Sequence, residues 1–219
     1  MIITSIKIGV IILSNRPADP NIEALSKKDI FDRVRDGDWY QFKHEPAMQK
    51  IVTESAIQIQ KINDVAKTDP DQALTMLHDI VPHLADDVAI LFPIATIEHP
   101  ACLTVGPGTF FNTGLQILSA GQVTIGSNCF IGPNCQLYTP NHHPSDKLLR
   151  RDGWQYDLPI TIGDDCWFGG SVIVLPGVTL GDNVVVGAGS VITKDVPSDT
   201  VVAGNPARPI QHHENSPAS

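Results

Sequence analysis

An aliphatic residue followed by glycine returns at a spacing of six between Ile125 and Lys194. The run begins with IGSNCF, IGPNCQ and LYTPNH, and after an interruption it continues with IGDDCW, FGGSVI, VLPGVT, LGDNVV, VGAGSV and ITKDVP. The fifth position of each unit is usually small or β-branched. Because a helix repeats every ~3.6 residues and a strand every ~2, a spacing of six indicates a larger structural repeat.

Such a unit is typical of a short strand and a turn, and three units form one coil of a triangular prism. Stacked coils bury the first-position side chains in an axial core, while backbone hydrogen bonds run from coil to coil. Glycine and asparagine supply the turn conformations at the corners. We therefore predict a mainly β fold, with a parallel β-helix at residues 89–210 between an N-terminal arm and helical segment (1–88) and a polar tail (211–219).

The repeat is interrupted between Leu137 and Ile162, which lie 25 residues apart, one more than four units. The segment 143–160 is therefore expected to leave the prism as a loop extruded at a corner. Long loops on a rigid scaffold are usually functional or disordered. The adjacent His142 and His143 at the base of this loop favour a function.

Residues 20–85 show helical periodicity and contain none of the hexapeptides. We expect one helix capped by Ser26, a longer one with Pro46 in its first turn, and a third that begins at Asp69 and Pro70. A β-helix exposes unpaired backbone at its terminal coil. These helices are therefore expected to cover the open end of the prism.

Composition limits the classes of partner. A formal net charge of −9 disfavours a nucleic-acid partner, because neutralising phosphates needs clustered Lys and Arg. The apolar residues 8–13 are too few to span a bilayer, and no clean signal-peptide cleavage site follows them, so we predict a cytoplasmic protein with no membrane partner. Three of the four cysteines occupy fifth positions and none has CxxC spacing, which indicates core residues and no metal site.

Three features together resemble the sugar O-acetyltransferase group of the hexapeptide acyltransferases, which includes maltose, galactoside and nodulation acetyltransferases. They are the string PITIGDDCWFGGSVIVLPGVTLGDNVVVGAGSVITKDVP, the closing AGNPARPI and a histidine at the root of the loop. The resemblance extends from about Val105 to Ile210. It implies a left-handed β-helix, a homotrimer with sites between subunits, and direct transfer of an acetyl group from acetyl-CoA to a hydroxyl of a saccharide or other small molecule.

The resemblance also assigns catalytic roles. The family uses a histidine as general base, which suits a side chain that titrates near neutrality. A gap-free alignment from Ile125 places His142 at that position, whereas alignment on the family's His-Pro pair would choose His143. We favour His142, because it completes the unit LYTPNH and is expected to stay anchored to the prism. Asn112 matches the asparagine that contacts the acceptor or positions the reacting groups.

For acetyl-CoA, the family uses backbone amides along the prism and basic side chains near its end. Gly170, Ala188, Thr193, Lys194 and Arg208 occupy those positions. Small residues would let the pantetheine arm approach the backbone, and the two cations would attract phosphates. The resemblance therefore implies a co-substrate site along the prism and no metal.

The positions that would choose the acceptor depart from the family. Trp167 matches an aromatic residue that lines the acceptor end. Phe42, Glu98 and Ala120 stand where the sugar-specific enzymes have polar acceptor contacts, and we take Phe42 and Glu98 as candidate contacts here. Acetyl transfer can therefore be retained while the acceptor changes.

Other functions stay open on this scaffold. One is acetylation of an amine, or of a xenobiotic such as an antibiotic hydroxyl. Another is a prism-shaped zinc carbonic anhydrase, which needs histidines on separate repeats, whereas the repeats here offer an adjacent pair. The last is a non-catalytic scaffold, which the retained His142, Asn112, Lys194 and Arg208 oppose.

Overall fold

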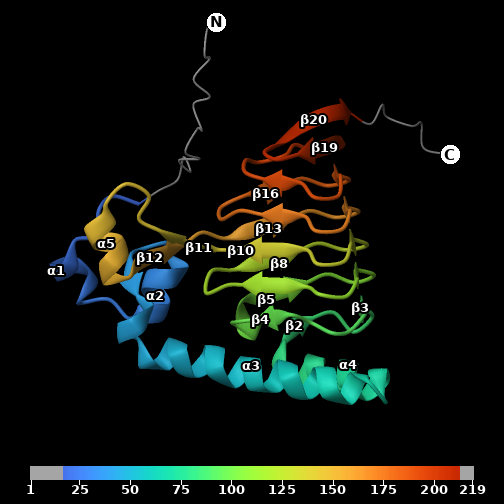
Figure 1. Ribbon diagram of the computed structural model, residues 1–219, viewed down its shortest axis with the longest axis horizontal. Coiled ribbons are helices and arrows are strands. Elements are labelled where there is room, and N and C mark those ends of the chain that lie inside the picture. The colour runs from blue at the N-terminus through green and yellow to red at the C-terminus, as the bar shows by residue number, and fades with distance from the viewer. Residues whose placement is uncertain (1–16, 213–219) are drawn as a thin grey trace, which may run out of the picture.

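The computed structural model describes residues 17–212. Figure 1 shows a tall β-solenoid with two helices beneath it and a smaller lobe at one side. The helices and 3-10 turns are α1 (Ile22–Leu25), α2 (Ile30–Arg35), η1 (Phe42–His44), α3 (Pro46–Ala66), α4 (Pro70–Ile80), η2 (Pro100–Cys102) and α5 (Lys147–Asp152).

The solenoid is a three-sided prism, and each side is a parallel sheet. The first face consists of β2 (His83–Leu84), β5 (Leu103–Val105), β8 (Val123–Ile125), β13 (Ile160–Ile162) and β16 (Thr179–Leu180). The second consists of β3 (Ala89–Ile90), β6 (Phe110–Phe111), β9 (Phe130–Ile131), β14 (Trp167–Phe168), β17 (Val185–Val186) and β19 (Thr200–Gly204). The third consists of β4 (Thr96–Ile97), β7 (Gln116–Leu118), β10 (Gln136–Tyr138), β15 (Ile173–Val174) and β18 (Val191–Ile192).

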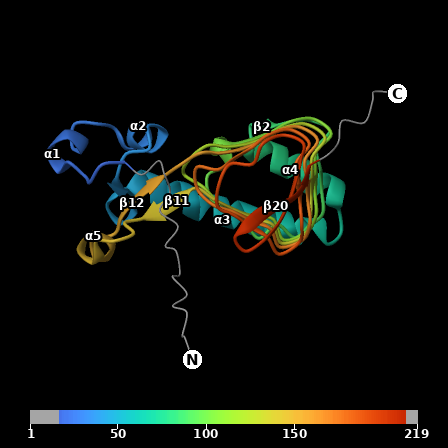
Figure 2. The same ribbon diagram turned by 90° about the horizontal axis from the view of Figure 1, so that it is seen from above.

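The chain visits the three faces in the same order in every coil, and it winds as a left-handed helix (Figure 2). The last strand, β20 (Ala207–His212), pairs antiparallel with β19 and closes the final coil. The predicted left-handed parallel β-helix is therefore confirmed.

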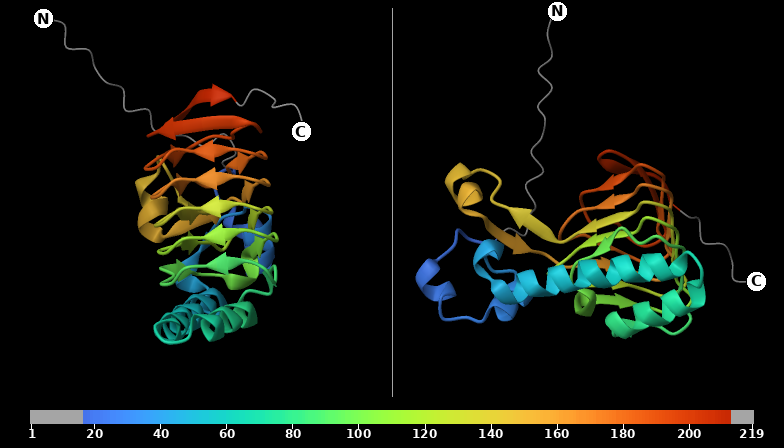
Figure 3. Two further views of the ribbon diagram at one scale, coloured as in Figure 1. Left: turned by 90° about the vertical axis from the view of Figure 1, so that its right-hand side faces the viewer. Right: turned by 60° about the horizontal axis from the view of Figure 1, so that its bottom comes forward.

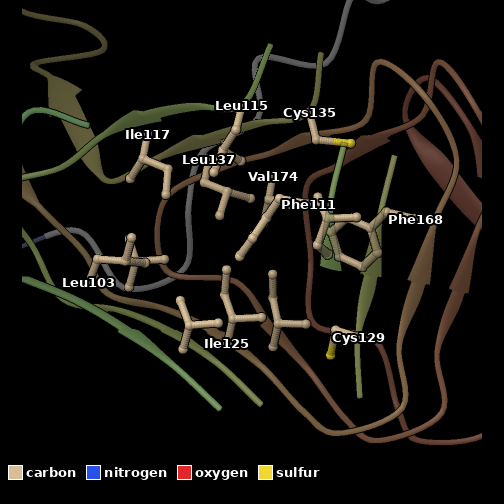
Figure 4. Close-up of a cluster of buried hydrophobic side chains, with 14 of the residues drawn as sticks. Leu103, Phe111, Leu115, Ile117, Ile125, Cys129, Cys135, Leu137, Phe168 and Val174 are labelled. Carbon is tan, nitrogen blue, oxygen red and sulfur yellow. The ribbon is translucent and has the colours of Figure 1, made fainter. Parts of the chain in front are cut away.

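The first and fifth positions of the hexapeptides point into the prism axis. In the eight units that remain within the prism, these side chains are at most 8% exposed. Figure 4 shows the side chains converging on the axis from all three faces. The thiols of Cys129, Cys135 and Cys166 each donate to a glycine carbonyl one coil further on, at 3.2–3.3 Å. The cysteines are free core residues, as predicted.

The fourth position of each unit turns the corner of the prism. Its φ is positive in seven of the eight units within the prism: it lies between 54° and 59° at Asn128, Asn134, Asp165, Ser171 and Asn183, and is 80° at Gly177 and 71° at Gly189. Short polar side chains tolerate this left-handed conformation better than bulky ones. The identity of the fourth residue therefore follows from the corner geometry.

The helices α3 and α4 cover the first coil, as expected (Figures 1 and 3). Ile59, Ile62 and Leu77 belong to the same buried cluster as the prism core. The amide side chain of Asn63 donates to the Ile94 carbonyl and accepts from the Ile94 N–H, both at 2.8 Å. These contacts satisfy backbone groups near the open edge of the sheet.

The start of the helical segment differs from the prediction. Ser26 does not begin a helix but ends the short helix α1. The N-cap of α2 is Asp29, whose carboxylate accepts from the Phe31 N–H at 2.9 Å. Asp29 lies immediately before the first helical residue, so its shorter path to the orphan N–H groups makes it the better cap.

The interruption of the repeat forms a second sheet outside the prism. Its strands are β1 (Tyr40–Gln41), β12 (Trp154–Asp157) and β11 (Pro140–His142), in the order β1-β12-β11 and all antiparallel. We call residues 17–44 and 139–158 together the side lobe. The Leu158 N–H donates to the Thr139 carbonyl at 2.9 Å, so the two ends of the inserted segment meet at the prism corner.

The expectation that His142 stays in a prism unit is wrong. The chain leaves the prism after β10, which ends at Tyr138. His142 lies on β11 opposite Gln155 of β12, in the side lobe. The unit LYTPNH keeps the hexapeptide spacing only up to its second residue, because β11 finds an antiparallel partner in β12 instead.

Candidate functional site

The two adjacent histidines have opposite environments. Cross-strand pairs place His142, Gln155 and Tyr40 in one row across β11, β12 and β1, and paired side chains share a face of the sheet. Neighbouring residues of a strand point to opposite faces. His142 accordingly shares a face with Tyr40, and His143 packs with Trp39 and the core beyond the other face.

His143 is a buried anchor of the loop. Its side chain is 2% exposed, and its ring stacks on Trp39 at a centroid distance of 5.3 Å. Nδ1 accepts from the Asp146 N–H at 2.8 Å, and Nε2 lies 3.2 Å from a carboxylate oxygen of Asp19. Because Nδ1 is an acceptor here, Nε2 holds the proton and donates to Asp19. Both ring nitrogens are engaged within the lobe.

His142 is exposed at the edge of the lobe. Its Nδ1 lies 3.4 Å from the backbone carbonyl oxygen of Trp154. A carbonyl oxygen only accepts, so this contact favours the tautomer with the proton on Nδ1. Nε2 is then the unprotonated nitrogen, which is the form a general base requires.

A buried carboxylate joins the lobe to the prism on the face that holds His142. Asp157 is 1% exposed. One oxygen accepts from the N–H groups of Ala120 and Gly121 at 3.2 and 3.1 Å and from the hydroxyl of Thr139. The other accepts from the Tyr40 hydroxyl at 2.5 Å. Burial, and secondarily the Asp157 charge, raises the pKa of Tyr40, so its hydroxyl stays protonated and donates.

Sequence reasoning missed Asp157, although the sequence contained a signal for it. In WQYDLP, strand alternation places Asp157 on the same face as Gln155 and opposite Trp154 and Tyr156. Gln155 itself donates to the Tyr40 hydroxyl at 2.7 Å. Gln155, Tyr40 and Asp157 therefore form a hydrogen-bonded chain that runs from the partner of His142 to the prism corner.

A cavity of about 260 Å³ lies beside Asp157, between α2, the start of α3 and the prism corner. His99 lines this cavity and is 5% exposed. Burial lowers the pKa of His99, and the nearby Asp157 opposes that shift. The apolar part of the lining includes Phe31, Val34, Met48, Ile51, Cys102 and Ala120.

The structure places the predicted acceptor contacts around this region. Phe42 and Ala120 pack against the buried cluster of Ile30, Val34, Tyr40 and Met48. Glu98 is half-buried next to β4. Burial, and then the charge of Asp157, raises the pKa of Glu98. Two of the three positions are therefore apolar surfaces, and the third is a carboxyl group in a desolvated setting.

A second constellation lies at the corner between the second and third faces. Asn112, Gly132, Gly170 and Ala188 lie at this corner in four successive coils. The Asn112 side-chain oxygen accepts from the Thr113 N–H at 2.8 Å. The side-chain amino group of Asn112 is a donor with no lone pair to offer, so it suits an oxygen of a bound molecule.

Coil stacking explains some of the small residues in this column. A Cβ atom added at Gly169 would lie 2.6 Å from the Ala188 nitrogen, and one added at Gly132 would lie 2.6 Å from the Gly169 carbonyl carbon. Gly170 is less restricted, since its nearest neighbour would be a Pro133 side-chain atom at 3.2 Å. Ala188 is exposed. A substitution that enlarges the side chain of Ala188 would therefore be the better test of a ligand along this corner.

The other predicted residues are not gathered at that corner. Thr193 and Lys194 follow β18, where the third face meets the first, and Arg208 is exposed on β20. Trp167 is 57% exposed on the outside of the second face, in register with Phe130, which is also 57% exposed. A single chain therefore distributes the predicted residues over two corners, one face and the side lobe.

Residues 17–212 contain neither a cluster of metal ligands nor a membrane-spanning helix. Within that range, no group of three or more His, Cys, Asp or Glu side chains is arranged to hold a metal ion. No helix in the same range is both long and apolar enough to cross a membrane.

Comparison with known proteins assigns the family. A model described as the hexapeptide repeat of succinyl-transferase matches residues 122–137 and 159–194. The galactoside O-acetyltransferase of Lactococcus lactis is 30% identical over 182 residues, which cover 83% of this chain and 87% of that protein. The chain belongs to the galactoside and maltose O-acetyltransferase family of hexapeptide-repeat acetyltransferases.

Solved structures of such acetyltransferases share the architecture. A maltose O-acetyltransferase from Clostridium difficile 630 aligns with a TM-score of 0.81 and 32% identity, covering 86% of this chain and 99% of that one. A galactoside acetyltransferase in complex with coenzyme A aligns with a TM-score of 0.75 and 29% identity, covering 84% and 91%. The likeness therefore includes the side lobe as well as the prism of this acetyltransferase.

Proposed function

We propose that this acetyltransferase transfers an acetyl group from acetyl-CoA to a hydroxyl of a saccharide or other small molecule, with His142 as the general base. One observation carries the assignment: His142 is exposed with its Nδ1 against the Trp154 carbonyl, which leaves Nε2 as a proton acceptor. His143 is buried with both nitrogens engaged. The coenzyme A complex of the galactoside acetyltransferase supports the choice of acetyl donor.

In the proposed reaction, Nε2 of His142 removes the proton of the acceptor hydroxyl as the oxygen attacks the thioester carbonyl. The new C–O bond forms, the C–S bond breaks, and the imidazolium returns its proton to the leaving thiolate. Acetylated acceptor and free CoA thiol result, and His142 ends neutral. The Trp154 carbonyl stabilises the imidazolium through Nδ1–H, and a positioned base of this kind contributes roughly 10²–10⁴-fold to the rate.

The corner between the second and third faces, which holds Asn112, Gly170 and Ala188, is the proposed site for the pantetheine arm of acetyl-CoA. Gly170 and Ala188 leave the backbone accessible, and the Asn112 amino group can donate to the acceptor or to the thioester oxygen. Lys194 and Arg208 supply positive charge for the phosphates of CoA in a protein of net charge −9, and Thr193 adjoins Lys194.

We further propose that each site lies between two subunits of a homotrimer. In one chain, His142 projects from the corner between the third and first faces, whereas Asn112 and Ala188 lie at the corner between the second and third faces. Figure 2 shows the side lobe leaving the prism at one corner. The exposed Trp167 precedes Gly170 on the second face, where it would line the acceptor end of a shared site.

The test of the transferase is release of free thiol from acetyl-CoA, measured with a panel of sugars, aromatic alcohols, amines and antibiotics. Thiol release that depends on a hydroxylated acceptor, together with an acetyl ester in the product by mass spectrometry, is the expected result. An amide product would assign an amine acceptor instead. Absence of acceptor-dependent thiol release across the panel would contradict the transferase.

Mixing two inactive variants tests the shared site. His142→Ala and Asn112→Ala subunits are unfolded, mixed and refolded together. If a site takes each residue from a different subunit, one of the three sites in each mixed trimer, or about one site in four of an equal refolded mixture, holds both native residues and activity returns. A mixture as inactive as its components, at a mass that shows trimers, would place both residues of a site in one chain.

A further inference from the structure

The cavity beside Asp157 has the composition of a ligand site. Its walls come from Phe31 and Val34 of α2, Met48 and Ile51 of α3, and Ala120 at the prism corner. Small-molecule sites are mostly apolar, with a few placed polar groups. At about 260 Å³, the cavity falls just below the roughly 300–1,000 Å³ of sites for drug-sized ligands, so it suits a single substituted ring.

His99 is a polar side chain in this cavity with unused hydrogen-bonding capacity. It is 5% exposed, and within residues 17–212 its ring nitrogens have no hydrogen-bond partner. Asp157 already accepts from four donors, and the exposed lining residues Arg35 and Gln122 bond to side chains outside the cavity. Among the described lining residues, His99 is therefore the buried polar side chain that is available to bind a ligand.

The cavity and His142 lie on the same face of the side-lobe sheet. Asp157 lines the cavity and is two residues from Gln155, the cross-strand partner of His142. Residues i and i+2 of a strand project to the same side and are ~7 Å apart. A molecule that fills the cavity can thus extend along this face toward His142.

We propose that the acceptor is a hydroxylated molecule with an apolar ring, that the ring occupies this cavity, and that a polar substituent on the ring hydrogen-bonds to His99. This inference rests on the proposed acetyl transfer at His142. Phe42 and Ala120, which stand where sugar-specific relatives have polar contacts, pack against the same apolar cluster. The structure therefore favours an aromatic or alicyclic alcohol over an unsubstituted sugar.

The experiment compares three acceptors in the thiol-release assay: 2-(4-hydroxyphenyl)ethanol, 2-phenylethanol and methyl glucoside. Burial of the ring should raise kcat/KM for both aromatic alcohols at least about tenfold above methyl glucoside. The phenol hydroxyl should add about a fivefold advantage over 2-phenylethanol, and His99→Phe should abolish that advantage. Ala120→Leu, which fills the cavity, should depress both aromatic alcohols and spare methyl glucoside.

Control variants distinguish loss of ring binding in the cavity from misfolding and from loss of acetyl transfer. Ala95→Leu adds the same bulk at an exposed position away from the cavity, and circular dichroism and thermal melts verify folding of each variant. Binding of 2-(4-hydroxyphenyl)ethanol without acetyl-CoA is followed by titration calorimetry and should persist in His142→Ala.

Two outcomes distinguish failure of the cavity proposal from failure of the proposed acetyl transfer. If methyl glucoside is acetylated as efficiently as the aromatic alcohols, and His99→Phe and Ala120→Leu change nothing, the cavity proposal is overturned while acetyl transfer stands. If the phenol binds in a His99-dependent manner but no acceptor releases thiol, the cavity binds the ring and the proposed function is wrong.

Discussion

The prism and the side lobe are stabilised in different ways. In the prism, each coil repeats the same apolar positions and the same parallel pairing, so every contact has equivalents above and below. In the lobe, segments far apart in the sequence meet through individual polar contacts. Tyr40 reaches Asp157, 117 residues away, and Asp19 reaches His143, 124 residues away.

The difference separates stability from function. A repeated ladder distributes its stability over many similar contacts. A polar network buried at low dielectric depends on each member, because an unsatisfied partner remains when one is removed. The proposed base, His142, lies in the lobe, and the proposed CoA corner lies on the prism. Changes in the lobe should therefore affect the acceptor half of the reaction most.

The largest expected effect is on turnover. His142→Ala should lower kcat by roughly two to four orders of magnitude, because the general base is lost, while acetyl-CoA binding and thermal stability stay near those of the native enzyme. Stopped-assay thiol release and calorimetric titration with CoA measure the two quantities.

His143→Ala is the matched control for that change. It should lower the melting temperature, because its ring joins Trp39, Asp19 and α5, and any loss of kcat should follow the loss of folded protein. A fully folded His143→Ala enzyme without turnover, beside an active His142→Ala enzyme, would exchange the two assignments.

The next effect is on stability of the lobe. Asp157→Asn should lower the free energy of unfolding by about 1–3 kcal/mol, because an amide NH₂ replaces one acceptor among the four donors around Asp157. Urea unfolding followed by tryptophan fluorescence measures it, since Trp39 and Trp154 lie in the lobe.

Asp164→Asn offers the comparison within the prism. The Asp164 carboxylate is exposed and accepts from the Ser127 N–H at 2.7 Å, a bond that an asparagine oxygen retains. The expected change is within about 0.5 kcal/mol. Equal destabilisation by the two substitutions would remove the distinction between the two regions.

A smaller effect is expected for acetyl-CoA. The double substitution Lys194→Ala and Arg208→Ala should raise the KM for acetyl-CoA roughly three- to tenfold, as two exposed charges are removed, without changing kcat. Acetyl-pantetheine, which lacks the nucleotide phosphates, should keep its KM. The pair Lys50→Ala and Lys61→Ala on α3 serves as the charge-matched control, and an equal rise there would point to net charge rather than to a phosphate site.

The smallest expected effect concerns pH. Burial lowers the pKa of His99 below its ordinary 6.5, so the unfolded chain binds a proton more readily than the folded one. Stability is then complete above about pH 6.5 and declines as the pH falls. The melting temperature of His99→Phe should fall less between pH 7 and 5 than that of the native enzyme. Parallel curves would show that His99 does not titrate differently on folding.

The prism could be predicted from sequence because one short pattern determines each of its coils. Ile125, Cys129 and their equivalents recur at fixed offsets, and the corner residues follow from a single left-handed conformation. Pro46 and the Asp69-Pro70 pair likewise mark helix starts by local rules, and α3 and α4 begin there. Features that depend on local or repeated patterns can therefore be predicted from a single sequence.

The lobe could be predicted only in part, because its contacts are neither local nor repeated. The spacing of Leu137 and Ile162 indicated an excursion, but nothing in the sequence paired β11 with β12 or β1. That pairing decides which histidine faces the solvent. The cavity needed five separate segments to be brought together, and His99, the buried polar side chain in its wall, had no motif around it.

The contact between Thr139 and Leu158 makes the inserted segment a unit that could be replaced without changing the prism. Because its two ends meet, the chain re-enters the prism beside the point where it left, and the number of residues in between is independent of the hexapeptide period. A surplus residue in this segment therefore causes no shift of register in the coils that follow. Residues 140–157 could be exchanged for those of a relative as one piece, which would test whether acceptor preference follows the inserted segment while the proposed acetyl-CoA corner is unchanged.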